Sequence, residues 1–228
     1  MFLLKNLLKN LKTRLYWILK GPYNPREFWQ RWGETFVDEP MQRKIYKEHH
    51  WIIKKLKEQN PKTILEVGCG FGRNIRFIAE NYHLNKDTGS DQRLEIVGVD
   101  FSDSMLESAS RFLKGLDQSR LKITTKKADA TNLPFKESSF DTVLSHGVLM
   151  HIKPDDIKKA IAEMVRVARK YIILIEQNDN SMPLKNRSFQ KMNYFSYAYP
   201  YKKLLTDQGA QIIEYHRTQE LDWFVARV

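Results

Sequence analysis

The feature that most constrains this fold is a short apolar segment that runs into a glycine-rich turn and then into a helical pattern. The segment and turn span Ile64–Gly72 (ILEVGCGFG), and the helical pattern covers Arg73–Tyr82. Gly68 and Gly70 let the backbone turn sharply and approach a ligand without an intervening side chain, and Gly72 permits close packing where the helix starts. The pattern predicts a strand–turn–helix unit, either a ligand-binding loop or a tight turn without a ligand.

Strands and helices alternate from Pro61 to the C-terminus. Such alternation predicts a Rossmann-like, doubly wound α/β fold with a mainly parallel, seven-stranded sheet covered on both faces. The turn between the last two strands is too short for a crossover helix, so we expect a C-terminal antiparallel hairpin. The expected strands are Thr63–Val67, Leu94–Val99, Leu121–Ala128, Phe140–Ser145, Tyr171–Glu176, Gln211–Tyr215 and Leu221–Ala226. The expected helices of this part are Arg73–Tyr82, 103–115, Pro154–Arg169 and 200–208.

Three parts are expected along the chain. Residues 1–22 form a basic amphipathic helix, because leucines recur at three- and four-residue steps while the cations lie off that stripe. Residues 23–60 form a helical N-terminal lid or cap segment, with an aromatic stretch at Phe28–Trp32 and a helix over 41–59. Residues 61–228 form the main domain.

The charge is concentrated near the N-terminus. The chain carries a net charge of +11, and residues 1–60 hold 13 cations against 6 anions. This asymmetry indicates an anionic partner, such as membrane lipid, nucleic acid or an acidic substrate. Residues 1–20 contain no acidic residue, and we expect them either to lie in the plane of an anionic membrane surface or to pack their leucines on protein.

Composition limits the compartment and the class of protein. The single cysteine, Cys69, excludes an internal disulfide and the usual cysteine-rich zinc modules. No apolar run approaches the ~18–20 residues that cross a bilayer. We therefore expect a cytoplasmic protein, either free or peripheral at the inner face of the membrane. His49 and His50 lack cysteine or acidic neighbours at ligand spacing, so no metal site is expected.

Acidic residues follow the second and third expected strands. Asp100 ends the second strand, where a carboxylate can accept hydrogen bonds from both hydroxyls of a ribose. Asp129 ends the third, and Phe140–Gly147 brings the fourth strand beside the glycine turn. Because doubly wound sheets bind nucleotides where strand ends converge, these positions predict a nucleotide site.

Together these motifs resemble the class I S-adenosylmethionine-dependent methyltransferases, particularly the small-molecule, methyltransferase type 11-like group. The motifs that carry the resemblance are Glu66–Gly72, Asp100–Ser102, Asp129–Phe135 and Phe140–Ile152. Dinucleotide-binding proteins more usually show G-x-G-x-x-G, whereas the third glycine here comes one residue early. A weaker similarity to methylases of pseudaminic acid and other surface-glycan pathways rests on Phe28–Trp32, Gly147–Ile152 and Asp222–Phe224.

The resemblance implies a cofactor, S-adenosylmethionine, and a set of residues that bind it. Glu66 would contact the methionine part, and Ser145 would offer its carbonyl to the ammonium. Asp100 would hold the ribose, Phe101 would lie against the adenine, and Asp129 would take the adenine amino group. The alternative is that the acidic residues cap helices and Phe101 is core. The whole expected set is Glu66, Gly68, Cys69, Gly70, Gly72, Asn74, Asp100, Phe101, Ser102, Asp129, Ala130 and Ser145.

The expected chemistry is the alignment of a nucleophile with the S–CH₃ bond, the reacting atoms ~3–3.5 Å apart. A hydroxyl nucleophile also benefits from a base, typically by 10²–10⁴-fold. The candidate catalytic residues are His146, which follows the fourth strand, and Glu176, which ends the fifth. His146 can equally be structural. Lys185, Arg187 and Lys191 either pair with a carboxylate or phosphate of the substrate or form an ordinary solvated run of charges in a loop.

Three classes of function are expected. The first is a methyltransferase that acts on a small molecule, such as a hydroxyl or other nucleophile of a glycan, lipid-linked or related metabolite. The second is a nucleic-acid methyltransferase, which the charge favours. It is disfavoured because the fourth strand lacks the Asn/Asp-Pro-Pro-aromatic sequence that holds a flipped base. The third is a protein that binds the cofactor without catalysis.

Overall fold

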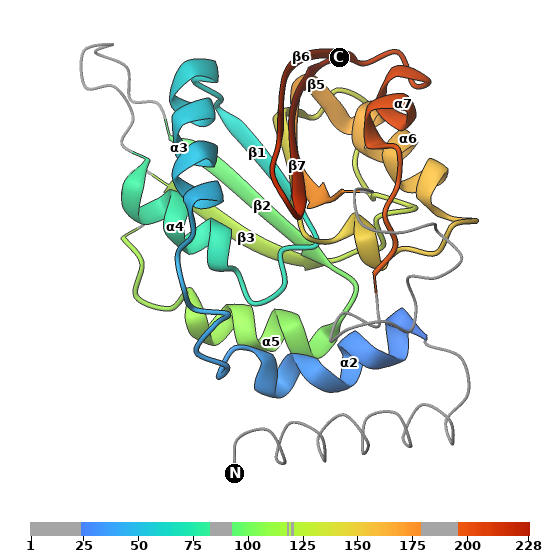
Figure 1. The fold of residues 1–228 in the computed structure, drawn as a ribbon. Coiled ribbons are helices and arrows are strands. Elements are labelled where there is room, and N and C mark those ends of the chain that lie inside the picture. The colour runs from blue at the N-terminus through green and yellow to red at the C-terminus, as the bar shows by residue number, and fades with distance from the viewer. Residues whose placement is uncertain (1–23, 83–92, 118, 120, 179–195) are drawn as a thin grey trace.

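The computed structural model describes residues 24–82, 93–117, 119, 121–178 and 196–228, and a single seven-stranded sheet forms its centre (Figure 1). The strand order is β3-β2-β1-β4-β5-β7-β6. β7 runs antiparallel to β5 and to β6, whereas β1 to β5 pair in parallel. The expected doubly wound sheet with a C-terminal antiparallel hairpin is confirmed. The strands are β1 Thr63–Val67, β2 Leu94–Asp100, β3 Leu121–Lys127, β4 Phe140–His146, β5 Ala168–Gln177, β6 Gln211–Arg217 and β7 Leu221–Arg227.

Helices cover both faces of the sheet, as Figure 1 shows. Residues alternate between the faces with the period of two that a strand imposes: Leu65 and Val67 pack in one apolar cluster, and Ile64 packs in the other. One face carries α3 Lys47–Gln59, α4 Arg73–Asn81 and α5 Asp103–Phe112. The other carries α6 Ile157–Val167 and α7 Tyr201–Thr206, and a 3₁₀ turn, η2 Leu149–His151, follows β4.

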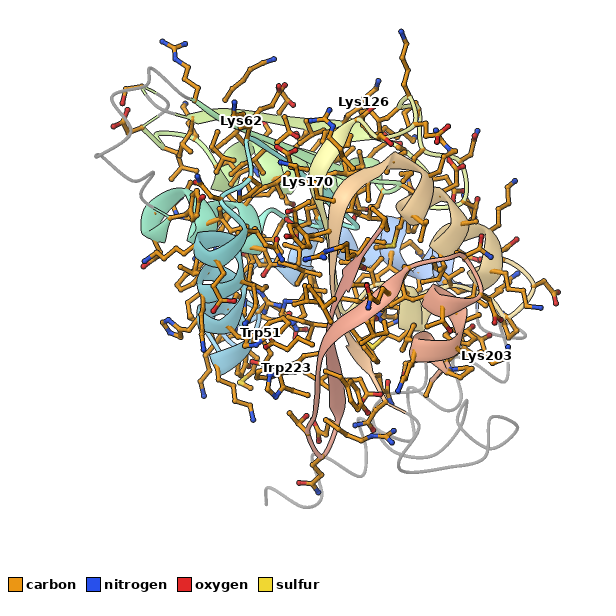
Figure 2. The ribbon with its side chains drawn as sticks, turned by 90° about the horizontal axis from the view of Figure 1, so that it is seen from above. Trp51, Lys62, Lys126, Lys170, Lys203 and Trp223 are labelled. Atoms are coloured by element: carbon orange, nitrogen blue, oxygen red, sulfur yellow. The ribbon has the colours of Figure 1, made fainter. Side chains whose placement is uncertain are left out.

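Helix α3 is part of the packed domain. Ile52 and Leu56 are almost fully buried in the cluster beneath it. The ring of Trp51 lies 5.4 Å from that of Trp223 on β7, centroid to centroid, and both are labelled in Figure 2. Lys55 forms an ion pair with Glu214 of β6. The helix therefore joins the N-terminal segment to the C-terminal hairpin.

The N-terminal segment begins with α2, Pro25–Phe36, and α3 begins later than the expected residue 41. Tyr46 is in an extended conformation at the N-cap of α3, and its amide donates to Nδ1 of His49. This contact satisfies one of the free amides at the helix start and fixes the boundary. The predicted helix at residues 1–20 lies outside the described residues. In the part of the chain that the structure describes, no helix is long and apolar enough to cross a bilayer.

Gly98, in the middle of β2, provides a test of the packing between the sheet and α4. A Cβ at this position would lie 2.5 Å from Cδ1 of Ile75 and 2.9 Å from Cβ of Cys69. We expect Gly98→Ala to reduce the free energy of unfolding by roughly 1–3 kcal/mol, measured by urea denaturation, because the core there has no room.

The matched control is the same change in an Ile75→Val background, which removes the Cδ1 atom. Gly98→Ala should then cost less than in the wild type, with the remaining cost due to Cys69. Equal costs in the two backgrounds would show that the contact with Ile75 is not the cause.

Candidate functional site

The glycine turn is held against the end of β2. The amides of Gly68 and Cys69 donate to the carbonyl of Val99, at 2.8 and 2.9 Å. Gly70 has a φ of +52°, and a Cβ there would meet only Sδ of Met105, at 3.9 Å. The backbone at Gly70 is therefore open to a close approach by a ligand, as the sequence predicts.

The other two glycines lie against packed side chains, which at Gly68 differs from the expected open approach to a ligand. A Cβ on Gly68 would lie 2.3 Å from a methyl group of Val148 in the loop after β4. A Cβ on Gly72 would meet the side chain of Leu113 at 3.0 Å, which agrees with the packing role expected from the sequence. Both residues have positive φ angles, of +73° and +86°, so a side chain there is also strained.

Asp100 ties the glycine turn to the loop after β2. Its Oδ2 accepts from the amide of Gly70, and its Oδ1 accepts from the amide of Ser102, both at 2.9 Å. The carboxylate is buried, which raises its pKa, and hydrogen bonds from the backbone of Ser102, Gly70 and Phe101 oppose this shift. The N-cap of α5 is Ser102, whose Oγ accepts from the amide of Met105. Asp100 is therefore not the capping residue of α5.

Asp129 and Phe101 lie at the other end of the site. Oδ1 of Asp129 accepts from the amide and the hydroxyl of Thr131, at 2.9 and 2.8 Å. Its Oδ2 pairs with Arg26 of α2. Burial raises the pKa of this carboxyl, but the contacts with Thr131 and Arg26 outweigh it and lower the pKa. The guanidinium carbon of Arg26 lies 5.7 Å from the centre of the Phe101 ring. Ala130 packs against the apolar cluster around β4.

Glu66 has a buried carboxylate with one oxygen left unsatisfied. Its Oε1 accepts from Nδ2 of Asn74 at 2.6 Å, and its Oε2 has no hydrogen-bond partner. Burial raises the pKa of Glu66 to about 8, although Asn74 and the charge of Arg73 lower it. A buried polar atom without a partner is costly, so this oxygen is a position for a hydrogen-bond donor of a ligand, and a cationic donor would favour the ionised carboxylate. The ammonium of the expected cofactor is such a group.

His146 continues this polar chain. Nδ2 of Asn74 donates to Glu66, and Oδ1 of the same Asn74 side chain lies 3.3 Å from Nδ1 of His146. We infer that Nδ1 carries the proton and that Nε2 keeps its lone pair. Burial, with the charges of Arg73 and His49, lowers the pKa of His146 to about 3. The imidazole is therefore neutral near pH 7 and acts as a hydrogen-bond acceptor through Nε2.

The structure does not bring Glu176, the second candidate base, into the open part of the site. Its carboxylate is fully buried, and burial raises its pKa to about 7 while four hydrogen bonds lower it. Both oxygens are engaged, so Glu176 anchors the turn after β4, and this arrangement favours a structural role over proton transfer. The donors are the hydroxyl of Ser145 and the amides of Val148, Leu149 and Met150.

Three further residues that the sequence analysis did not assign to the site lie close to its candidate residues. Arg26 comes from α2. Arg73 follows the glycine turn, donates from Nη1 to the carbonyl of Gln42 at 3.1 Å, and has its pKa lowered by burial. His49 of α3 lies with its ring 5.3 Å from that of His146, and its buried Nε2 has no partner. Only the position of Arg73 beside Gly72 offered a signal in the sequence.

The remaining candidates from the sequence, Lys185, Arg187 and Lys191, lie outside the described residues. Within the described ranges, no group of three or more histidine, cysteine or acidic side chains is arranged to hold a metal ion.

Comparison with known proteins shows that the chain is similar to methyltransferases. A family model described as "Methyltransferase domain" matches residues 64–171. The chain is 32% identical to a demethylmenaquinone methyltransferase of Clavibacter sepedonicus over 68% of its own length and 56% of that protein's. It is 31% identical to norajmaline N-methyltransferase of Rauvolfia serpentina over 48% of its length and 33% of that protein's. It is 25% identical to a tRNA N(3)-methylcytidine methyltransferase of Drosophila melanogaster over 55% of its length and 40% of that protein's.

The chain thus spans a third to just over half of the length of these relatives. Among solved structures, it resembles a SAM-dependent methyltransferase of Aquifex aeolicus with a TM-score of 0.63. That likeness covers 91% of this chain and 100% of the other, at 16% identity. A SAM-dependent methyltransferase of Methanosarcina mazei matches with a TM-score of 0.60, at 20% identity, over 80% and 97%. At these identities the likeness shows the fold.

The raised pKa of Glu66 predicts how binding of S-adenosylhomocysteine depends on pH. Glu66 is largely protonated at neutral pH, and a bound ammonium favours its ionised form. Affinity should therefore rise with pH, by up to ~10-fold per unit, and level off near the pKa of about 8. Calorimetry between roughly pH 6 and 8 measures this. Glu66→Gln should remove the dependence, and a flat wild-type profile would show that Glu66 does not hold the ammonium.

Proposed function

The chain belongs to the class I S-adenosylmethionine-dependent methyltransferase family through the domain at residues 64–171, and from this premise we propose that the protein methylates a small-molecule acceptor. The acceptor that we favour is a hydroxyl or other nucleophile of a glycan, lipid-linked or related metabolite. The demethylmenaquinone and norajmaline methyltransferases among its relatives support a small acceptor. Because the chain spans only part of each relative, its own acceptor is part of the proposal.

The observation that carries the proposal is the unpartnered Oε2 of Glu66 beside an open glycine turn. The oxygen is buried and lacks a hydrogen-bond donor, and the space at Gly70 admits a ligand next to the backbone. Asp100, which binds the amide of Gly70, is the acceptor proposed for the hydroxyl groups. A ligand with an ammonium at one end and a ribose next to it fits these groups.

S-adenosylmethionine supplies an electrophilic methyl group, so the residues of this chain need to bind and orient more than to activate. Glu66 is proposed to hold the ammonium and Asp100 the ribose. His146 stands at the end of β4 with Nε2 as an acceptor, and it would hold an O–H or N–H of the acceptor molecule. Its low pKa makes it a weak base, which suits orientation of the nucleophile or an acceptor with an acidic proton.

Methylation of RNA is the second candidate, because the chain is similar to a tRNA methyltransferase and carries a net charge of +11. The sequence at the end of β4, Ser145–Val148, has no Pro-Pro pair of the kind that holds a flipped base. Salt-sensitive binding of tRNA with micromolar affinity would favour this candidate over a small acceptor. Binding of the cofactor without any transfer would favour a non-catalytic role.

The function is tested by methyl transfer. Incubation of the protein with S-adenosylmethionine and fractionated cell extract should give a small-molecule product heavier by one CH₂ group, detected by mass spectrometry. A product in the RNA fraction would instead establish the second candidate. Turnover at subsaturating S-adenosylmethionine should fall in Asp100→Ala and be retained in Asp117→Ala, which changes an exposed aspartate in the loop between α5 and β3.

Asp100→Ala should also weaken binding of S-adenosylhomocysteine by ~1.5–3 kcal/mol, the scale of hydrogen bonds to a charged group. Asp100→Asn retains the shape of the side chain, so its affinity should fall between that of the wild type and that of Asp100→Ala. The melting temperature of each variant identifies any loss of folding. Calorimetry in which the folded wild-type protein binds no S-adenosylhomocysteine would refute the assignment of the cofactor.

Residues 1–20 give a separate prediction, since they lie outside the described residues and their membrane role rests on sequence alone. We propose that their five cations and leucine stripe hold the protein on an anionic membrane surface, at ~1 kcal/mol per cation. The full chain should sediment with anionic but not neutral vesicles, and salt should weaken this. Deletion of residues 1–20 should abolish sedimentation and preserve cofactor binding. If the truncated protein still sediments with the vesicles, another part of the chain binds the membrane.

A further inference from the structure

Helix α2 is fastened across the first turn of α5, beside the adenine end of the proposed cofactor site. The hydroxyl of Ser102 donates to the carbonyl of Trp29 at 3.1 Å, and that of Ser104 donates to the carbonyl of Gln30 at 2.8 Å. The amide of the Gln30 side chain donates to Asp103 at 3.3 Å. Figure 1 shows α2 lying alongside α5. These contacts hold the helix in place whatever the Arg26 side chain does.

Arg26, in the first turn of α2, engages Asp129 and Phe101, the two residues that the family resemblance assigns to the adenine of the proposed cofactor. Because Thr131 occupies Oδ1 of Asp129, only Oδ2 is left to receive an amino group, and Arg26 pairs with this oxygen. The same guanidinium lies over the ring of Phe101, with its carbon 5.7 Å from the ring centre. An adenine that donates to Asp129 and stacks on Phe101 would need both positions.

The contact that Arg26 makes is easily displaced. Its side chain is 64% exposed and that of Asp129 is 31% exposed. Exposed ion pairs contribute little to stability, and salt screens them. A base that stacks on an aromatic ring and donates to the carboxylate can therefore replace the guanidinium, and the arginine has solvent to move into.

We propose that Arg26 gates the adenine subsite: it holds Oδ2 of Asp129 and covers Phe101 in the cofactor-free protein, and it swings aside when an adenine binds. This inference rests on the proposed function, since it requires the adenine subsite at Asp129. Because helix α2 is anchored, the guanidinium of Arg26 stays close to Asp129. Arg26 therefore competes with the adenine of the cofactor for that carboxylate. The affinity for the cofactor is then set partly by an ion pair, and it depends on ionic strength.

Calorimetric titration with S-adenosylhomocysteine tests the gate, because this ligand carries the adenine and no net charge. Arg26→Ala should bind it about 1.5- to 5-fold more tightly than the wild type at low salt, the range that loss of an exposed pair gives. Arg26→Gln, which keeps the length and polarity of the side chain, should show the same gain. The matched control is Arg31→Ala. Arg31 is a cation of the same helix and pairs with Glu27.

Ionic strength gives the second readout. Since salt screens the pair between Arg26 and Asp129, wild-type affinity should rise with salt and approach that of Arg26→Ala, whose own affinity should stay flat. Arg31→Ala should behave as the wild type does. Melting temperatures verify that each variant folds.

Each other outcome overturns the gate. Weaker binding by both Arg26 variants would show that the arginine holds the cofactor. Equal binding by wild type, Arg26→Ala and Arg26→Gln at all salt concentrations would show that it does not compete. Binding by none of the folded proteins would refute the cofactor site itself, and the proposed function with it, which separates that failure from failure of the gate alone.

Discussion

The carboxylate of Asp100 is the contact on which the geometry of the site depends. It accepts one backbone amide from Gly70 in the turn after β1 and another from Ser102 in the loop after β2. Burial disfavours the charged carboxylate, and hydrogen bonds from the backbone offset part of that cost. Because β1 and β2 are parallel neighbours, this single side chain fixes two strand ends relative to each other. The open backbone at Gly70 is a consequence of that arrangement.

Two buried glutamates show how burial separates a structural role from a binding role. Glu176 has donors on both oxygens, from Ser145 and from three successive amides, and needs nothing further from a ligand. Glu66 receives one hydrogen bond, from Asn74, and its second oxygen is buried without a donor. Burying that oxygen without a donor costs free energy, and a bound cation would offset this cost. The position of each glutamate at a strand end gives no such distinction.

The N-terminal helices complete a site whose framework comes from the sheet. α3 brings His49 beside His146 and joins the hairpin through Trp51, so it belongs to the core. α2 brings Arg26 to Asp129 through an exposed and weak ion pair. The strong contacts thus lie in the sheet and its loops, and the displaceable contact lies at the mouth of the site. This division suits a site that is preorganised but has to admit its ligand.

The sequence alone determined the fold, because the period of two in the strands and the glycine turn are local patterns that neighbouring residues impose. It also predicted that Asp100 and Asp129 lie near each other, since the carboxyl ends of parallel strands share one edge of the sheet, whereas Glu66 entered only through the resemblance to a family. Only the tertiary structure decided what each polar group does. Glu176 is saturated with donors and Arg26 reaches Asp129 across 103 residues of chain. Hydrogen-bond partners so distant in sequence follow from packing, on which periodicity and spacing give no information.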